Sequence, residues 1–225
     1  QLASPRQGAT RFGSLHLQKI MATLPHVDVV LDWSRENAGW LARVHPAVQS
    51  VPYGFIEADF YEMSALHEPR FDVGFVGSLE ALDGRRKIIL NELRNCFQVH
   101  PKSNGVWKSA KYSLFRDCRI ILNLHVEASG VFESPRFFDV LGAGRPLITE
   151  PVLDSWPFVR GRDFFETTVM KLEQDVGRLL EDIELQETLV TMVLNAVEDN
   201  NMRGTAFTVL RHLLIAHEGL RSLTR

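Results

Sequence analysis

The segment RIILNLHVEASGVFESPRFFDVLGAGRPLITE, residues 119–150, decides the fold of this chain. It begins with an apolar run, residues 119–125, that is typical of a buried strand, and it ends with a second short run, residues 146–149. Between them, residues 136–141 have helical spacing, and the glycines that follow are typical of a helix end. A strand, a helix and a strand in this order predict two parallel strands joined by a crossover helix.

The same alternation continues on both sides of this segment. It predicts further strands at 71–76, 97–99 and 163–165, and further helices at 85–95, near 106–114, at 172–180 and from about 185 to 220. Nearer the N-terminus, short strands at 27–31 and 48–51 flank a helix that Ser34 would cap. We therefore expect an α/β fold, with a Rossmann-like parallel sheet covered by helices on both faces over residues 71–195.

Composition excludes several classes of protein. The chain has 225 residues, 45 % hydrophobic and 24 % charged, and its net charge of -3 argues against broad electrostatic binding to nucleic acid. No apolar run approaches the roughly 18 residues of a membrane span, and no signal peptide is visible. Cys96 and Cys118 are too few for a disulfide framework or a four-cysteine zinc site, and we expect both to be buried thiols. These features predict a cytoplasmic protein.

Candidate ligand-binding residues are those that follow the strands, because ligands bind at the carboxyl ends of strands in open parallel sheets. Gly77 and Ser78 follow the strand at 71–76, where a glycine lets backbone N–H groups approach an anion and a serine adds a hydroxyl donor. Arg85 and Arg86 come next and could meet a phosphate. The alternatives are a simple tight turn and a solvated helix start.

The densest group of polar residues follows the strand at 119–125. It comprises His125, Glu127, Ser129, Glu133, Ser134, Arg136 and Asp139. The H-x-E pattern at 125–127 lacks the Pro-Cys-x-x-Cys partner of zinc deaminases, so we expect no zinc site. Arg136 and Asp139 lie on one helix face. They form either a surface ion pair, or a phosphate clamp beside an acceptor for a ribose diol. His125 alone is equally explained as a hydrogen-bonded core or rim histidine.

Several well-known site signatures are missing. Gly142 and Gly144 lack a third glycine and follow a helix, and no Walker-type loop occurs, so classical NAD and P-loop sites have little support. The Gly-x-Ser-x-Gly elbow of α/β-hydrolases is also absent. No Asp-x-Asp pair is present to hold a nucleotide sugar through a metal, so metal dependence is not indicated.

Residues 119–150 resemble the donor-binding segment of GT-B glycosyltransferases, closest to the CgeB-like branch of the family-4 group. The shared pattern is a Leu-Asn strand, a Gly/Ser loop, an arginine, an aromatic, an acidic residue, then Ala/Leu-x-x-Gly and a return strand. Residues 72–90 resemble the opening of that family's C-terminal domain. Residues 29–54 resemble the end of its N-terminal domain, including a Val-Pro-Tyr-Gly-Phe hinge.

The resemblance implies a UDP-linked sugar donor and no other cofactor. By position, Asp139 matches the acidic residue that holds the donor ribose, and Ser134 and Arg136 precede it in the part that faces the diphosphate. Gly77 and Ser78 match the glycine turn near the phosphates, and Arg86, with Arg85 as the neighbouring choice, matches the arginine after that turn. Arg136 and Arg86 would then stabilise the departing diphosphate.

Other candidates for the donor site are His125 and Glu133. The first acid of the family's Glu-x7-Glu motif would fall at Val131 in this chain. Glu133 or Glu127 is therefore expected to stand in for that acid near the transferred sugar.

The resemblance also implies a division into domains. Residues 1–54 would be a remnant of the N-terminal, acceptor-side domain, 55–70 a hinge, 71–195 the nucleotide-sugar-binding domain, and 196–225 C-terminal helices that pack back on the N-terminal part. Because few residues precede the hinge, the chain looks trimmed. We expect a second copy or a partner chain to complete the N-terminal half.

Three functions follow as hypotheses. The first is a glycosyltransferase of the hexosyltransferase type, or its donor-binding half, which needs no metal and acts on an unknown acceptor. The alternative is a non-catalytic nucleotide-sugar-binding module that acts with a partner chain. A third is a nucleotide-sugar epimerase on the same fold, with Glu127 and Glu133 as its acidic bases.

Overall fold

The structure is a computed structural model that describes residues 18–52, 68–79, 84–103, 105–106, 108–125, 130 and 134–199. The described residues fall into two compact units, 18–52 and 68–199. The predicted hinge at 55–70 lies almost entirely outside the described residues, and so do residues 200–225. The expected packing of the C-terminal helices on the N-terminal part therefore stays a prediction, as does the assignment of the first unit to an acceptor-side domain.

The first unit contains a two-stranded parallel sheet around one helix. Strands β1 (Val30–Asp32) and β2 (Val48–Ser50) pair in parallel, and α2 (Arg35–Leu41) connects them. Helical residues 18–23 and a 3-10 turn, η1 (Leu24–His26), come before β1. The Ser34 hydroxyl oxygen accepts a hydrogen bond of 3.2 Å from the Asn37 backbone N–H. This N-cap confirms the predicted start of α2.

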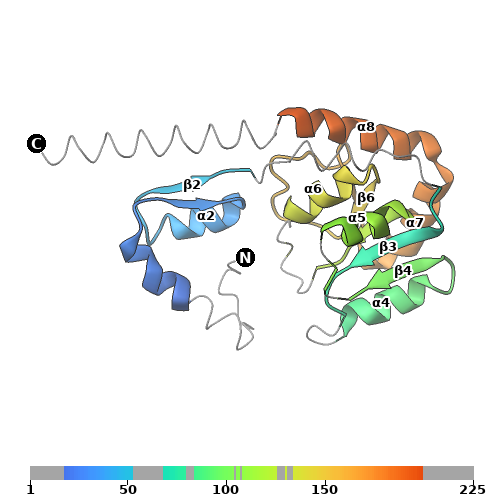
Figure 1. The fold of residues 1–225 in the computed structure, drawn as a ribbon, viewed down its shortest axis with the longest axis horizontal. Helices are drawn as coiled ribbons and strands as arrows, with labels where there is room; N and C mark the ends of the chain where they lie inside the picture. The colour runs from blue at the N-terminus through green and yellow to red at the C-terminus, as the bar shows by residue number, and fades with distance from the viewer. Residues whose placement is uncertain are drawn as a thin grey trace, which may run out of the picture. The chain divides into compact units, whose positions relative to one another are not determined.

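The second unit is built on a five-stranded sheet in which every pairing is parallel (Figure 1). Its spatial order is β4-β3-β5-β6-β7. The strands are β3 (Phe71–Val76), β4 (Val99–Lys102), β5 (Cys118–Asn123), β6 (Leu147–Thr149) and β7 (Phe165–Glu166). The helices are α4 (Arg85–Leu93), α5 (Lys108–Arg116), α6 (Ser134–Gly142), α7 (Leu172–Glu181) and α8 (Ile183–Asp199), with a 3-10 turn η2 (Val169–Lys171) before α7.

Helices cover both faces of this sheet, as predicted. Ile121 of β5 belongs to a core that includes side chains from α5 and α6, among them Phe115 and Phe137. The neighbouring Ile120 belongs to a second core with side chains from α4, α7 and α8, among them Leu90. Successive strand residues point to opposite faces, so the continuous apolar run of β5 supplies both cores.

Strand β3 passes very close to β5 at Gly74. A Cβ atom at this position would lie 2.7 Å from Cys118 Sγ and 2.9 Å from Ile121 Cδ1. Real Cβ atoms essentially never approach heavy atoms so closely. The absence of a side chain at Gly74 therefore allows Cys118 to occupy the interior between the two strands.

Several local expectations differ from the structure, among them the start of β1, which lies at Val30 rather than at residue 27. Strand β4 begins at Val99, two residues later than predicted, because 94–97 form the turn that closes α4. Cys96 lies in that turn and is exposed rather than buried, and its hydrogen bond with Glu173 raises the pKa of its thiol. Strand β7 begins at Phe165 rather than 163. Cys118 is buried as expected, and burial raises the pKa of its thiol to about 12.

No helix within the described part of the chain is long and apolar enough to cross a membrane.

Candidate functional site

The strand order predicts a ligand site between the carboxyl ends of β3 and β5. The chain passes from β3 outward to β4 on one side, and then returns to β5 on the other side of β3. In doubly wound sheets of this order, loops diverge at such a switch point and leave room for a ligand. The residues that follow β3 and β5 are the ones selected from the sequence.

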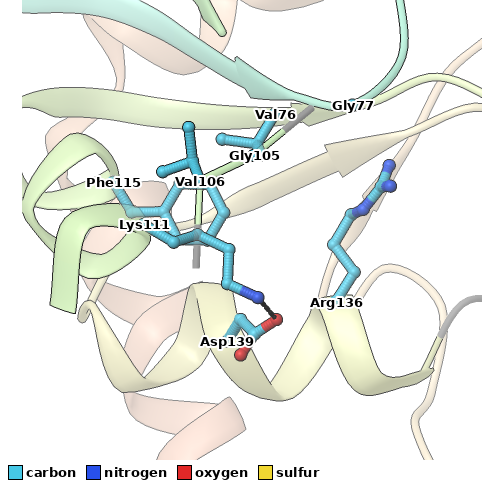
Figure 2. A pocket seen from close by; sticks show the side chains of 8 residues that line it. All are labelled: Val76, Gly77, Gly105, Val106, Lys111, Phe115, Arg136 and Asp139. Carbon is cyan, nitrogen blue, oxygen red and sulfur yellow. Dashed lines mark hydrogen bonds and ion pairs between the residues drawn. The ribbon is translucent and has the colours of Figure 1, made fainter. Parts of the chain in front are cut away.

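A cavity of about 160 Å³ lies at this edge of the sheet (Figure 2). Its lining joins the end of β3, the loop after β4, and helices α5 and α6, through Val76, Gly77, Gly105, Val106, Lys111, Phe115, Arg136 and Asp139. A dry cavity of about 150 Å³ accommodates a benzene ring. The cavity is therefore large enough for one ring-sized portion of a ligand, with apolar walls and three charged side chains.

Asp139 faces the cavity from α6 and is held by two residues of α5. One carboxylate oxygen forms an ion pair with the Lys111 ammonium, and the other lies 3.3 Å from the Tyr112 hydroxyl. The side chains of Lys111 and Asp139 are 19 % and 23 % exposed. The pair is therefore shielded from water, while the carboxylate stays accessible from the cavity.

Arg136 lies one helical turn before Asp139 and points toward the end of β5 (Figure 2). Its Nη1 donates a hydrogen bond of 2.6 Å to Asn123 Oδ1. The amide nitrogen of Asn123 in turn donates to the Thr149 hydroxyl oxygen at 3.0 Å. Asn123 and Thr149 are both buried, so polar groups at the ends of β5 and β6 hold the arginine.

The turn after β3 is tightly packed. A Cβ atom at Gly77 would lie 3.0 Å from the Phe75 ring and 3.4 Å from the Arg86 guanidinium. Arg86 is 4 % exposed and donates to the carbonyl oxygens of Ser78, at 3.2 Å, and Leu124, at 2.6 Å. The guanidinium thus ties the end of β3 to the end of β5, beneath the candidate anion site.

Arg85 occupies a different position from its neighbour. Its guanidinium forms a two-pronged ion pair with Glu150, one contact of which measures 3.0 Å. The same carboxylate accepts a hydrogen bond of 2.7 Å from the His125 backbone N–H. The His125 ring is buried, with Nε2 3.2 Å from the Pro151 carbonyl oxygen, which matches the expected arrangement of a hydrogen-bonded rim histidine.

The structure brings Gly77, Arg136 and Asp139 together around one cavity. Ser78 and Arg86 do not line it, but the Arg86 guanidinium lies next to Gly77 and is hydrogen-bonded to the Ser78 carbonyl oxygen. His125 lies beside the end of β5 but does not line the cavity. Glu127 and Glu133 lie outside the described residues. Ser134 is the first residue of α6, and its side chain also lies outside the description.

Sequence reasoning missed five residues of this region. They are Lys111, Tyr112, Asn123, Thr149 and Glu150. Asn123, Thr149 and Glu150 could have been found, since each is a polar residue at the carboxyl end of a predicted buried strand. Lys111 and Tyr112 gave no such signal, because their position depends on how α5 packs beside α6.

No group of three or more histidine, cysteine or acidic side chains that could hold a metal ion occurs among the residues that the structure describes.

A family model described as glycosyl transferase-like matches residues 65–201 of this chain, which include every described element of the second unit. The chain belongs to this glycosyl transferase-like family. No functionally curated protein matches the sequence of this family member. The CgeB-like branch stays a prediction.

Solved structures confirm the GT-B type of fold for this glycosyl transferase-like chain. It is similar to TarM of S. aureus with a TM-score of 0.66 and 8 % identity, over 92 % of this chain and 47 % of that one. It is similar to Anabaena HepE in complex with UDP-glucose, with a TM-score of 0.61 and 12 % identity, over 99 % and 70 %.

A third similar structure is the pneumococcal O-GlcNAc transferase GtfA in complex with UDP and GlcNAc. The TM-score is 0.58 and the identity 10 %, over 90 % of this chain and 48 % of that one. The glycosyl transferase-like chain therefore spans about half the length of TarM and GtfA.

Proposed function

We propose that this chain binds a UDP-linked sugar and forms the donor-binding part of a hexosyl-transferring glycosyltransferase. The observation that carries the proposal is the cavity at the β3/β5 switch point, with Gly77, Arg136 and Asp139 in its lining. The solved structures of HepE and GtfA, which contain UDP-glucose and UDP with GlcNAc, support the choice of nucleotide.

Each lining group has a role in the proposed binding mode. The Asp139 carboxylate accepts hydrogen bonds from the ribose diol, because an ionised acceptor binds two hydroxyl donors more strongly than a neutral group. The diphosphate lies near Arg136 and the Gly77–Ser78 turn. The cavity encloses one ring of the nucleoside, and Val76, Val106 and Phe115 form the apolar part of its lining.

The same groups would assist transfer. When the bond between the sugar and the β-phosphate breaks, negative charge grows on the departing UDP. A guanidinium held in advance at that position stabilises the charge without reorganisation. Arg136 fills this role in the proposal. Arg86, which the sequence also suggested, is instead expected to support the site from below, because its guanidinium is directed to two backbone carbonyl oxygens.

We also propose that transfer needs no metal ion and that the protein is located in the cytoplasm. Positive side chains and backbone N–H groups would take the part that a divalent cation takes in metal-dependent transferases. Two free thiols support a reducing compartment such as the cytoplasm.

Calorimetric titration of the protein with UDP, UDP-glucose and uridine, with and without EDTA, tests the proposal. We expect UDP to bind more tightly than uridine and EDTA to change neither affinity. A protein that binds none of the three at millimolar concentration would overturn the donor site.

The alternative function is a donor-binding module that lacks catalysis by itself. In this alternative, the cavity binds the donor and a partner chain binds the acceptor. Release of UDP from UDP-glucose, followed by a coupled assay in the presence of candidate acceptors, distinguishes the two: turnover supports the transferase, and binding without turnover supports the module.

A further inference from the structure

Two buried polar residues lie at the ends of adjacent strands beside the arginine of the candidate site: Asn123 contacts Arg136, and Thr149 contacts Asn123. Asn123 is 3 % exposed and Thr149 is fully buried. They are direct partners in the register of β5 with β6. Polar side chains in such positions cost free energy unless they are hydrogen-bonded, so their bonds indicate what they hold in place.

The direction of the hydrogen bonds follows from the chemistry of the groups. A guanidinium only donates, so the Asn123 carbonyl oxygen must be the atom that faces Arg136, at 2.6 Å from Nη1. The amide nitrogen then faces Thr149 and donates to its hydroxyl oxygen at 3.0 Å. The Thr149 hydroxyl proton is directed to the Glu150 carbonyl oxygen at 3.1 Å. The three hydrogen bonds therefore form a series in which each donor and each acceptor is determined, from Arg136 through Asn123 to Thr149.

We propose that Asn123 is the positioning residue that aims Arg136 at the donor diphosphate, and that Thr149 fixes the Asn123 amide for this task. The inference rests on the proposed function, since it assumes that Arg136 meets a diphosphate. An amide orients the guanidinium through a hydrogen bond and adds no negative charge of its own. A carboxylate at the same place would orient the guanidinium too, but it would compete with the diphosphate for the positive charge.

The quantity that reports this role is the UDP preference, defined as the uridine dissociation constant divided by that of UDP. A defect in folding or in nucleoside binding changes both constants together and leaves the UDP preference unchanged. If Arg136 is no longer directed at the diphosphate, or loses its positive charge, only the affinity for UDP decreases. Arg136→Ala gives the value expected when the arginine contributes nothing.

Asn123→Asp is the first test variant, because it keeps the size of the side chain and an oxygen toward Arg136, while it adds a charge and replaces the amide donor to Thr149 by an acceptor. We expect it to lower the UDP preference by about fivefold or more, since an added charge in contact with a guanidinium cancels much of its attraction for an anion. Uridine affinity should stay within about twofold of the original value.

Thr149→Val and Thr149→Ser form a matched pair that does not touch Arg136. Valine keeps the shape of threonine but removes the oxygen that fixes the amide, and serine keeps the oxygen. We expect Thr149→Val to lower the UDP preference by about threefold, and Thr149→Ser to retain it. Thermal unfolding of each variant verifies that the fold is intact, and this pair decides the matter if Asn123→Asp does not fold.

The outcomes separate the inference from the proposed function. An original protein with no UDP preference overturns the proposed function. A UDP preference that Arg136→Ala abolishes but Asn123→Asp and Thr149→Val leave intact overturns only the role of Asn123 and Thr149. Reduced preference in both variants, with rescue in Thr149→Ser, supports the inference.

Discussion

Lys111 of α5 and Asp139 of α6 form an ion pair in the lining of the cavity, although 28 residues separate them in the sequence. A carboxylate offers about four acceptor positions. Lys111 and Tyr112 use two of them, so a ribose diol can still bind to the rest. The ion pair therefore orients Asp139 without blocking it.

Lys111→Met should weaken uridine binding by about two- to fivefold, because a partly shielded ion pair contributes on the order of 0.5–1 kcal/mol to the orientation of the carboxylate. Lys111→Arg should retain most of the affinity. Titration with 2′-deoxyuridine is the control. This ligand lacks one hydroxyl of the diol, so Lys111→Met should change its affinity by a smaller factor than that of uridine. Tighter uridine binding in Lys111→Met would mean that the lysine competes with the diol instead.

Asp139→Ala and Arg136→Ala should affect different parts of the ligand. Asp139→Ala removes charge-assisted hydrogen bonds to the ribose and should weaken UDP and uridine equally, by about ten- to a hundredfold. Arg136→Ala should weaken UDP more than uridine. Calorimetry with both ligands checks this, with the exposed Arg94→Ala as a matched control outside the cavity. If Asp139→Ala leaves UDP affinity unchanged, the assignment of the ribose site is wrong.

Gly74→Ala should destabilise the fold by about 1–3 kcal/mol, because its methyl group would overlap Cys118 Sγ and the Ile121 side chain. Cys118→Ala removes the sulfur atom, the nearest of these contacts, and so relieves part of the overlap. Urea unfolding of both single variants and the double variant gives the coupling. The double variant should be more stable than the sum of the single changes predicts, and strict additivity would contradict the close approach.

The two thiols should differ in reactivity and in their effect on alkaline stability. Iodoacetamide should label exposed Cys96 in the folded protein, and Cys118 only after unfolding. Burial raises the pKa of Cys118 from 9.0 to about 12. Between these values the unfolded chain releases a proton that the folded chain keeps, so this stabilising contribution is complete below pH 9 and is lost as the pH rises toward 12.

The slope of that loss is about 1.4 kcal/mol per pH unit for one group. The alkaline stability of Cys118→Ala should lack this component when urea unfolding is compared with the original protein from pH 8 upward. Equal slopes in the two proteins would contradict the pKa of Cys118.

Self-association is the expected behaviour of the first unit. Several large apolar side chains of this unit are exposed, namely Met21, Val27, Leu31 and Val44. Leu31 lies in β1, a strand of a two-stranded sheet, and exposed apolar strands favour pairing with another chain. Light scattering over a range of concentrations should show mass increasing above that of the monomer. A constant monomer mass at high concentration would contradict the expectation.

Most of the sheet could be predicted from local patterns. The runs at 71–76 and 119–125 contain enough consecutive apolar residues to require burial on both faces, and the glycines after α6 defined its end. Strand β4 was harder, because Val99–Lys102 contains a histidine, a proline and a lysine and is only partly buried. Its place at the edge of the sheet explains why such a sequence is tolerated.

The candidate site was predictable only in part for a similar reason. Gly77 follows β3, and Arg136 and Asp139 lie in the first two turns of the helix after β5, so their approximate place follows from chain order. The different partners of Arg85 and Arg86 do not follow from it. One points to Glu150 and the other into the interior beneath Ser78, and which of two adjacent helix residues does so depends on the rotation of α4 against the sheet.

The pairing of Asn123 with Thr149 also has a consequence for how the chain reaches its native alignment. A shift of β6 by one residue against β5 would exchange its two faces and place the Thr149 hydroxyl in the apolar core that Ile148 contacts in the native register. A shift by two residues would place Leu147 opposite the Asn123 amide. Either shift would leave a buried polar group without a hydrogen-bond partner, which costs about 1–3 kcal/mol. The pair of Asn123 and Thr149 therefore selects one register for two short hydrophobic strands. Without it, their apolar side chains would allow the strands to pair in other registers.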